Sequence, residues 1–186
     1  MKMLLSTLGT SLGELILASD EAGTIRALDF VDHQPRCYRY LREHFRDFEA
    51  VHAAMPGIFA EPLNAYFDGE LDVLNTLPIA PAGTEFQRRV WDLLRLIPSG
   101  ETTYYGEIAR RLGFSDPRKA IEVGAAIGAN PIAIIVPCHR VVAKNGDLKG
   151  YAWGVRRKRW LLEHEGAGRA VPLKGRVGAS LSLPGF

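Results

Sequence analysis

The organisation of this chain can be inferred outward from residues 130–142, which read NPIAIIVPCHRVV. The apolar run is rich in β-branched residues and stops at Pro137, which predicts a buried strand that delivers Cys138 and His139 to a turn. A cysteine is a nucleophile as its thiolate, and the neighbouring imidazole and the cation of Arg140 favour that form. A cysteine at the end of a strand is also often a small packed hydrophobe, so both interpretations stay open for this stretch alone.

Composition excludes several classes of protein. No apolar stretch reaches the roughly 18 residues that span a bilayer, and residues 1–6 lack the apolar core of a signal peptide, so we expect a cytoplasmic protein with no membrane partner. The two cysteines, Cys37 and Cys138, lack metal-ligand spacing, which argues against a disulfide framework or a zinc cluster. His33 and Cys37 stand four residues apart, but two ligands do not make a metal site.

The net charge of +2 hides a division along the chain. Residues 1–77 carry 6 Lys/Arg and 12 Asp/Glu, residues 78–165 carry 14 and 9, and residues 166–186 carry 3 and 0. This asymmetry predicts an acidic supporting domain and a basic domain whose partner is a polyanion. The alternative is that the cations are solvated helix faces.

The N-terminal part has the pattern of a scaffold. Short apolar stretches between residues 3 and 31, separated by glycine-containing turns, predict an antiparallel meander. Helices are predicted over residues 36–50, after Pro35, and over 62–67, beginning at Pro62. The proline-rich segment 78–83 is the predicted linker. We therefore expect a scaffold domain over residues 1–77, a second domain over 78–166 and a flexible tail over 167–186.

The second half is predicted to be mainly helical. Thr84 is a candidate N-cap for a helix with apolar residues at three- and four-residue spacing. Helices over 105–112 and 118–129, joined by a short glycine-containing turn, form a helix-turn-helix pattern, whose second helix meets a nucleic-acid groove. Gly124 and Gly128 cost helix propensity, so either the protein core or a DNA backbone should approach this helix closely. The basic start of a final helix over 156–165 conflicts with the helix dipole, a conflict that a phosphate would relieve.

Several spaced motifs resemble one known family, the O6-alkylguanine-DNA alkyltransferases. The resemblance is dense over about residues 83–166 and looser before them. It is carried by Gly83-Thr84-Glu85-Phe86-Gln87, Ile97-Pro98-Ser99-Gly100-Glu101-Thr102, Asn130-Pro131, Pro137-Cys138-His139-Arg140-Val141 and Lys158-Arg159-Trp160-Leu161-Leu162-Glu163-His164-Glu165.

The resemblance implies an α/β fold, with an N-terminal α+β, ribonuclease H-like domain followed by a mainly helical winged helix-turn-helix domain. It implies a monomer that binds double-stranded DNA containing O6-alkylguanine, flips the damaged base and transfers the alkyl group once to Cys138. It implies no cofactor and no metal. A thioether on Cys138 is stable, so each molecule would act once and be inactivated.

The resemblance also implies roles for individual residues. Cys138 would be the acceptor, His139 the base that deprotonates it through a water, Glu165 the carboxylate that orients His139, and Asn130 the hinge between the second helix and the active-site turn. The residues expected to bind the flipped base are Tyr105, Val141, Tyr151, Ala152, Trp153 and Lys158. The residues expected to contact DNA are Arg118, Lys119, Ile121, Gly124, Ala125 and Arg140.

The chain departs from the family pattern in two places, the second helix of the helix-turn-helix and the loop at Trp153. Ile121 and Glu122 stand where the family usually has an arginine, which fills the space of the flipped base, and an alanine. An apolar wedge can also hold bases apart, whereas Glu122 near phosphates should weaken binding. Trp153 replaces a glycine found in some members, so we expect a narrow pocket that prefers methyl to benzyl groups. Equal transfer rates from methyl- and benzyl-substituted guanine would contradict that expectation.

Three other functions are compatible with parts of the pattern. An alkyltransferase-like protein would bind lesions without transfer, but such proteins lack the acceptor cysteine. A Cys-His hydrolase would need an oxyanion hole, and none is evident. A redox-sensing winged-helix regulator would use Cys138 as its sensor.

Overall fold

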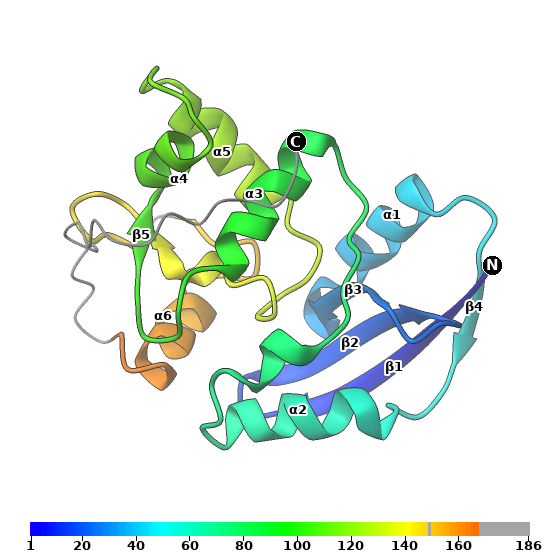
Figure 1. Cartoon of the computed structure of the whole chain (residues 1–186). Coiled ribbons are helices and arrows are strands. Elements are labelled where there is room, and N and C mark those ends of the chain that lie inside the picture. The colour runs from blue at the N-terminus through cyan, green and yellow to red at the C-terminus, as the bar shows by residue number, and fades with distance from the viewer. Residues whose placement is uncertain (149, 168–186) are drawn as a thin grey trace.

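A mixed four-stranded sheet forms the base of the N-terminal part (Figure 1). The computed structural model describes residues 1–148 and 150–167. The strands are β1 (Lys2–Thr10), β2 (Gly13–Asp20), β3 (Ile25–Phe30) and β4 (Glu49–His52), in the order β3-β2-β1-β4. The antiparallel pairs β1–β2 and β2–β3 confirm the predicted meander.

Strand β4 was missed by the sequence prediction. It pairs in parallel with β1, with Lys2 opposite Glu49 and Leu5 opposite His52. Only Val51 in it is even half-buried, so it lacks the apolar alternation by which a strand is recognised. The predicted helix over residues 36–50 is therefore shorter, and β4 occupies its last part.

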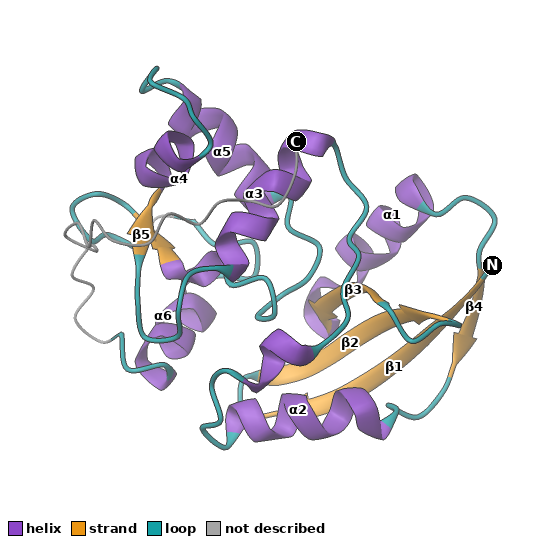
Figure 2. Cartoon of the chain, viewed as in Figure 1, coloured by secondary structure: helices purple, strands orange, loops and turns teal. Residues whose placement is uncertain are grey.

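Two helices cover opposite faces of this sheet, as the positions of α1 and α2 show (Figure 2). Helix α1 (Gln34–His44) has proline in its first turn, as predicted. Helix α2 (Gly57–Phe67) begins at Gly57, so the prediction that Pro62 opens it was wrong. Phe59 is buried in the core one turn before Pro62, and this packing outweighs the backbone hydrogen bond that the proline removes.

The second half is built around helices α3 (Glu85–Arg95), α4 (Tyr105–Arg111), α5 (Lys119–Gly128) and α6 (Val155–His164). Thr84 caps α3 in a reciprocal capping box with Gln87, which confirms the predicted start. Helices α4 and α5 pack together as the predicted helix-turn-helix. Two short parallel strands, β5 (Thr103–Tyr104) and β6 (Val141–Val142), lie beside them.

The outer edge of β3, the last strand of the sheet, joins the two halves. The Leu28 N–H donates to the Pro131 carbonyl at 3.0 Å, and the Ala133 N–H donates to the Leu28 carbonyl at 2.7 Å. The linker is held on the same strand, because the Ile25 N–H donates to the Pro78 carbonyl at 2.9 Å. The turn that precedes Cys138 is thus positioned by the N-terminal sheet.

The predicted flexible tail falls largely outside the described residues. Ala167, its first residue, is buried with Val142 and Leu162, and the division at residues 166 and 167 stays a prediction. The remaining tail residues, 168–186, are among those not described. Within the described ranges, no helix has the length and apolar content needed to cross a membrane.

Candidate active site

The segment before Cys138 is a buried irregular turn and not the predicted strand. Asn130 organises it: its side-chain oxygen accepts from the Ile132 N–H at 2.9 Å, and its Nδ2 donates to the carbonyls of Ile132 (3.1 Å) and Val136 (2.9 Å). Ile134 has φ of 64°, a left-handed conformation that a β-branched residue rarely adopts. The apolar run is explained by burial from all sides. Strand β3 hydrogen bonds the segment at Pro131 and Ala133, and Asn130 supplies further hydrogen bonds at Ile132 and Val136.

Cys138 lies at the start of a short 3₁₀ helix, η3 (Cys138–Arg140), and is only 4% exposed. Nδ2 of Asn130 lies 3.3 Å from its Sγ. Burial raises the pKa of the thiol to about 11, although the Asn130 hydrogen bond and the charge of Lys158 act in the opposite direction. In the free protein the group is therefore a thiol at neutral pH. The groups that favour its ionisation in the free protein include Asn130, Lys158 and Arg36.

His139 and Glu165 form a fully buried pair. Nε2 of His139 lies 2.8 Å from Oε1 of Glu165, and both side chains are 0% exposed. Burial alone would raise the pKa of Glu165, but the hydrogen bonds and charges of His139 and Arg140 outweigh it and hold that pKa well below its usual range. An ionised carboxylate only accepts, so Nε2 carries the proton and Nδ1 of a neutral imidazole keeps its lone pair. Nδ1 has no hydrogen-bond partner among the described residues.

Arg140 is turned away from the surface, which corrects its expected role in DNA contact. The residue is 6% exposed. Its Nε donates to Oε2 of Glu165 at 2.8 Å, and its Nη2 donates to Oε1 at 2.9 Å and to the Ser99 hydroxyl at 2.9 Å. Nη1 donates to the Ile97 carbonyl. Arg140 therefore fixes Glu165, and four of its five N–H donors are used inside the protein.

The loop before α6 forms one wall of the site. Lys158 is buried, and its Nζ donates to the carbonyls of Val141 (2.6 Å) and Gly150 (3.2 Å). Burial lowers the pKa of Lys158 to about 8. The Tyr151 ring stands edge-on to His139 with centroids 6.4 Å apart, and its buried hydroxyl has no hydrogen-bond partner in the described part of the chain. Ala152 follows, half-buried.

Trp153 points from this loop toward β3. Its Nε1 donates to Oδ1 of Asp29, and the guanidinium of Arg36 lies 4.8 Å from its ring centroid. Its ring also contacts Tyr151, at 5.0 Å between centroids, and Tyr151 in turn faces His139. The expected narrowing of the pocket by Trp153 stays a prediction.

Tyr105 lies against the glycine in the middle of α5. A Cβ on Gly124 would meet the Tyr105 ring at 3.7 Å, an ordinary van der Waals distance, so this contact leaves room for a small side chain and does not by itself require glycine. Burial raises the pKa of Tyr105, and the nearby Cys138 adds to this shift. Tyr105 thus lies between the second helix of the helix-turn-helix and the thiol.

Several of the outward-facing residues of α5 have small side chains and are exposed to solvent. Ile121 is 77% exposed, and Ala125 is exposed one turn further along. Lys119 pairs with Glu122 at 2.8 Å, so the acidic side chain expected to oppose phosphates is neutralised within the helix. Arg118 is exposed and pairs with Asp116 in the same way. A single large apolar side chain therefore stands on a face of otherwise small residues.

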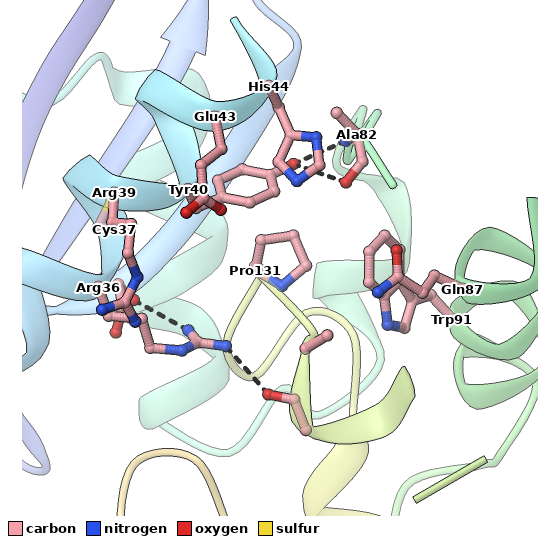
Figure 3. A pocket seen from close by; sticks show the side chains of 13 residues that line it. Arg36, Cys37, Arg39, Tyr40, Glu43, His44, Ala82, Gln87, Trp91 and Pro131 are labelled. Carbon is pink, nitrogen blue, oxygen red and sulfur yellow. Dashed lines mark hydrogen bonds and ion pairs between the residues drawn. The ribbon is translucent and has the colours of Figure 1, made fainter. Parts of the chain in front are cut away.

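A separate cleft of about 320 Å³ lies between α1 and the segment that contains Ala129 and Pro131 (Figure 3). Arg36 crosses it, with Nη2 donating to the carbonyls of Gly128 (3.3 Å) and Asn130 (2.6 Å) and Nη1 donating to Asp29 (3.1 Å). Cys138 does not line this cleft.

Cys37 does line the cleft, but with His33 alone it makes no metal site. The residues that the structure describes contain no group of three or more His, Cys, Asp or Glu able to hold a metal ion.

Sequence reasoning missed three residues that hold the site from the N-terminal half: Asp29, Arg36 and Tyr66. Tyr66 donates its hydroxyl to Oε1 of Glu165 at 2.7 Å. Their partners lie roughly a hundred positions away, and no local pattern signals such a contact. A charged residue among apolar neighbours, as Asp29 is between Leu28 and Phe30 in β3, was the available hint.

Both halves of the chain match family models of one kind of protein. Residues 3–81 match the ribonuclease-like domain of 6-O-methylguanine DNA methyltransferase, and residues 85–167 match its DNA binding domain. The methylated-DNA–protein-cysteine methyltransferase of Shigella flexneri is 45% identical over 168 residues, 89% of this chain and 97% of that protein. That of Mycobacterium bovis is 50% identical over 131 residues, 69% of this chain and 73% of that protein.

Solved structures show the same similarity. The crystal structure of Mycobacterium tuberculosis OGT in complex with DNA superposes with a TM-score of 0.70 at 38% identity, covering 90% of this chain and 95% of that one. The O6-methylguanine-DNA methyltransferase of Pyrococcus kodakaraensis gives a TM-score of 0.67 at 25% identity, covering 88% and 99%. The similarity therefore extends over both halves of the described fold.

Proposed function

The chain belongs to the 6-O-methylguanine DNA methyltransferase family, and from this premise we propose that it repairs DNA by moving an alkyl group, chiefly methyl, from O6 of guanine to Sγ of Cys138. The observation that carries the assignment to Cys138 is its placement: the thiol is held by Asn130 and directly precedes the buried His139–Glu165 pair. The protein acts on double-stranded DNA, as a monomer, and each molecule reacts once.

The reaction is an in-line displacement at the alkyl carbon. The S–C bond forms as the C–O bond breaks, and guanine leaves with the electron pair. In the net reaction the proton lost by the thiol ends on N1 of guanine, which leaves His139 neutral again. The thiol proton passes to Nδ1 of His139 through a water, because Nδ1 is the ring nitrogen with a free lone pair. Glu165 stabilises the imidazolium that forms, and its low pKa keeps it ionised throughout. The products are a thioether on Cys138 and unmodified guanine.

The flipped base is bound by the residues around the thiol. Tyr105 and Tyr151 flank it, Val141 and Ala152 offer backbone groups to its edge, and Lys158 holds the loop that carries this wall. Desolvated hydroxyls such as that of Tyr151 gain a partner when a polar base edge enters. The Trp153 ring packs against the Tyr151 ring and holds it in place.

The outer face of α5 meets the duplex. Arg118 and Lys119 approach phosphates, and the small residues Gly124 and Ala125 allow close contact with the backbone. Ile121 enters the stack as an apolar wedge where the base has been extruded. Extrusion costs a few kcal/mol and costs least where alkylation has weakened the base pair.

Intact-protein mass spectrometry after incubation with an O6-methylguanine duplex tests this proposal. One methyl should be gained, on the peptide that contains Cys138, and Cys138→Ala should gain none. Cys37→Ala should gain one methyl like the wild type, because Cys37 lies outside the site and burial raises its pKa to about 12. Tight lesion binding without any mass gain would favour an alkyltransferase-like binding protein.

A further inference from the structure

We propose that Tyr66, in the N-terminal half, is a positioning residue for the Glu165–His139 pair, an inference that rests on the proposed function of that pair. Tyr66 lies on α2, is 0% exposed, and donates its hydroxyl to Oε1 of Glu165 at 2.7 Å. The two residues are 99 positions apart in the chain. The half of the chain expected to be a scaffold thus contributes a hydrogen bond to the proposed reaction centre.

Oε1 of Glu165 is shared by three donors. Nε2 of His139 lies at 2.8 Å, Nη2 of Arg140 at 2.9 Å and the Tyr66 hydroxyl at 2.7 Å, whereas Oε2 accepts from Nε of Arg140 at 2.8 Å. Tyr66 and His139 therefore compete for electron density on the same oxygen. A donor at this position weakens the pull of Glu165 on the His139 proton.

The phenol is fixed in this role by its surroundings. The Tyr66 ring stands edge-on to Phe67 at 5.5 Å and to His164 at 5.2 Å between centroids. The Tyr66 carbonyl lies 2.7 Å from Nε2 of His164, one residue before Glu165. Burial and the neighbouring Glu165 raise the pKa of Tyr66 far above its usual value, so its hydroxyl is a permanent donor.

The consequence concerns the charge of His139. Burial lowers its pKa, and the positive charges of Arg140 and Lys158 act in the same direction, whereas Glu165 opposes them. Tyr151 also faces the imidazole, with its ring edge. By donating a hydrogen bond to Oε1, Tyr66 lowers the electron density on that oxygen and weakens the effect by which Glu165 raises the His139 pKa. Tyr66 thus helps to keep the imidazole neutral, which is the form that accepts a proton from the thiol.

The variant Tyr66→Phe removes only the hydroxyl and leaves Oε1 with two donors. The matched control is Tyr40→Phe: Tyr40 is another tyrosine whose hydroxyl is hydrogen bonded, but to the Ala82 backbone, away from the site. Two quantities are measured from about pH 4.5 to 9. One is the single-turnover rate of methyl transfer from an O6-methylguanine duplex, and the other is the His139 pKa from ¹⁵N NMR of the DNA-free protein.

Tyr66→Phe should raise the His139 pKa and move the acid limb of the rate profile to higher pH, with a rate at pH 6 lower by about threefold to tenfold. Tyr40→Phe should leave both at their wild-type positions, even if its thermal stability falls. Identical profiles and His139 pKa values for Tyr66→Phe and the wild type would overturn the proposal.

A second substitution covers the case in which Tyr66→Phe does not fold. Replacing Tyr66 by 3-fluorotyrosine keeps the shape and strengthens the donor, so the His139 pKa should fall, and a rise or no change would count against the role of Tyr66. A wild-type protein that transfers no methyl group would contradict the proposed function, whereas the NMR comparison would still test the contact between Tyr66 and the Glu165–His139 pair.

Discussion

The buried His139–Glu165 pair links the proposed chemistry to folding stability. The folded protein disfavours imidazolium at His139, since burial lowers its pKa from an ordinary 6.5. The unfolded chain protonates near pH 6.5, so below that pH it binds a proton that the folded state does not. Stability is therefore fully present above pH 6.5 and is lost as the pH falls toward the His139 pKa of the folded state.

Replacing His139 by Gln should remove this part of the pH dependence. Urea unfolding of the wild type should give a smaller free energy of unfolding at pH 5.5 than at pH 7.5, and His139→Gln should reduce that difference. His52→Gln, at an exposed histidine, should keep it. An unchanged pH dependence in His139→Gln would mean that this imidazole does not resist protonation.

At the scale of a single element, α5 presents one large apolar side chain to solvent. Ile121 is 77% exposed, beside the small residues Gly124 and Ala125, and its apolar surface would leave water if it entered a base stack. If Ile121 fills the space of the flipped base, Ile121→Ala should lower the rate of methyl transfer from duplex DNA by roughly tenfold, about 1.4 kcal/mol. Transfer from the free O6-methylguanine base, which needs no flipping, should be unchanged.

The control for that comparison is Ile58→Ala. Ile58 is 59% exposed on α2, so the same volume is removed from another surface. Equal losses in the two variants, or a loss with the free base as well, would argue against a wedge at Ile121.

The side chain of Arg36 links Asp29 of β3 to the backbone of the turn at Asn130. Asp29 is 1% exposed, and burial raises its pKa although Arg36, Trp153 and the Phe30 N–H oppose that shift. Arg36→Met should leave this carboxylate without its ion pair and destabilise the fold by roughly 3–5 kcal/mol at pH 7. Arg39→Met, at an exposed arginine of the same helix, should cost little.

The direction of the pH effect in Arg36→Met distinguishes this cause from a general loss of packing. A buried carboxylate with a raised pKa binds a proton more readily in the folded state than in the unfolded one. Stability should therefore recover as the pH falls from 7 toward 5 relative to the wild type, measured by urea unfolding at each pH. A loss that does not change with pH would point to lost packing instead.

The sequence predicted those helices and strands that are determined by neighbouring residues in the chain. Thr84 with Gln87 marked the start of α3, and the glycine-separated strands marked the meander. The segment before Cys138 was mispredicted because its apolar residues are buried by the whole fold, and beyond its short contact with β3 it is held by hydrogen bonds from the side chain of Asn130. Tyr66 could not be found at all, since its partner lies in another part of the chain.

For the molecule as a whole, the charge distribution suggests two separate parts, whereas the packing joins them. The acidic and basic halves differ in net charge, as expected of a support and a DNA-binding part. Yet a single cluster of buried apolar residues includes Leu28 of β3, Leu63 of α2 and Leu94 of α3. The halves therefore share this core, although the sheet face under α1 is buried within the N-terminal half by a separate cluster that includes Leu5, Ile16 and Leu41.

A shared core predicts that the protein unfolds as one unit. The interface also contains the β3 backbone bonds to the turn at Pro131, the Arg36 bonds to Asn130 and the Tyr66–Glu165 bond, so separation of the halves would expose both apolar surface and buried polar groups. Thermal melts followed by far-ultraviolet circular dichroism and by tryptophan fluorescence should coincide, because the tryptophans lie in the second half and the sheet in the first. Two separated transitions would show that the N-terminal half folds independently, and the bonds from β3 and α2 could not then position the site.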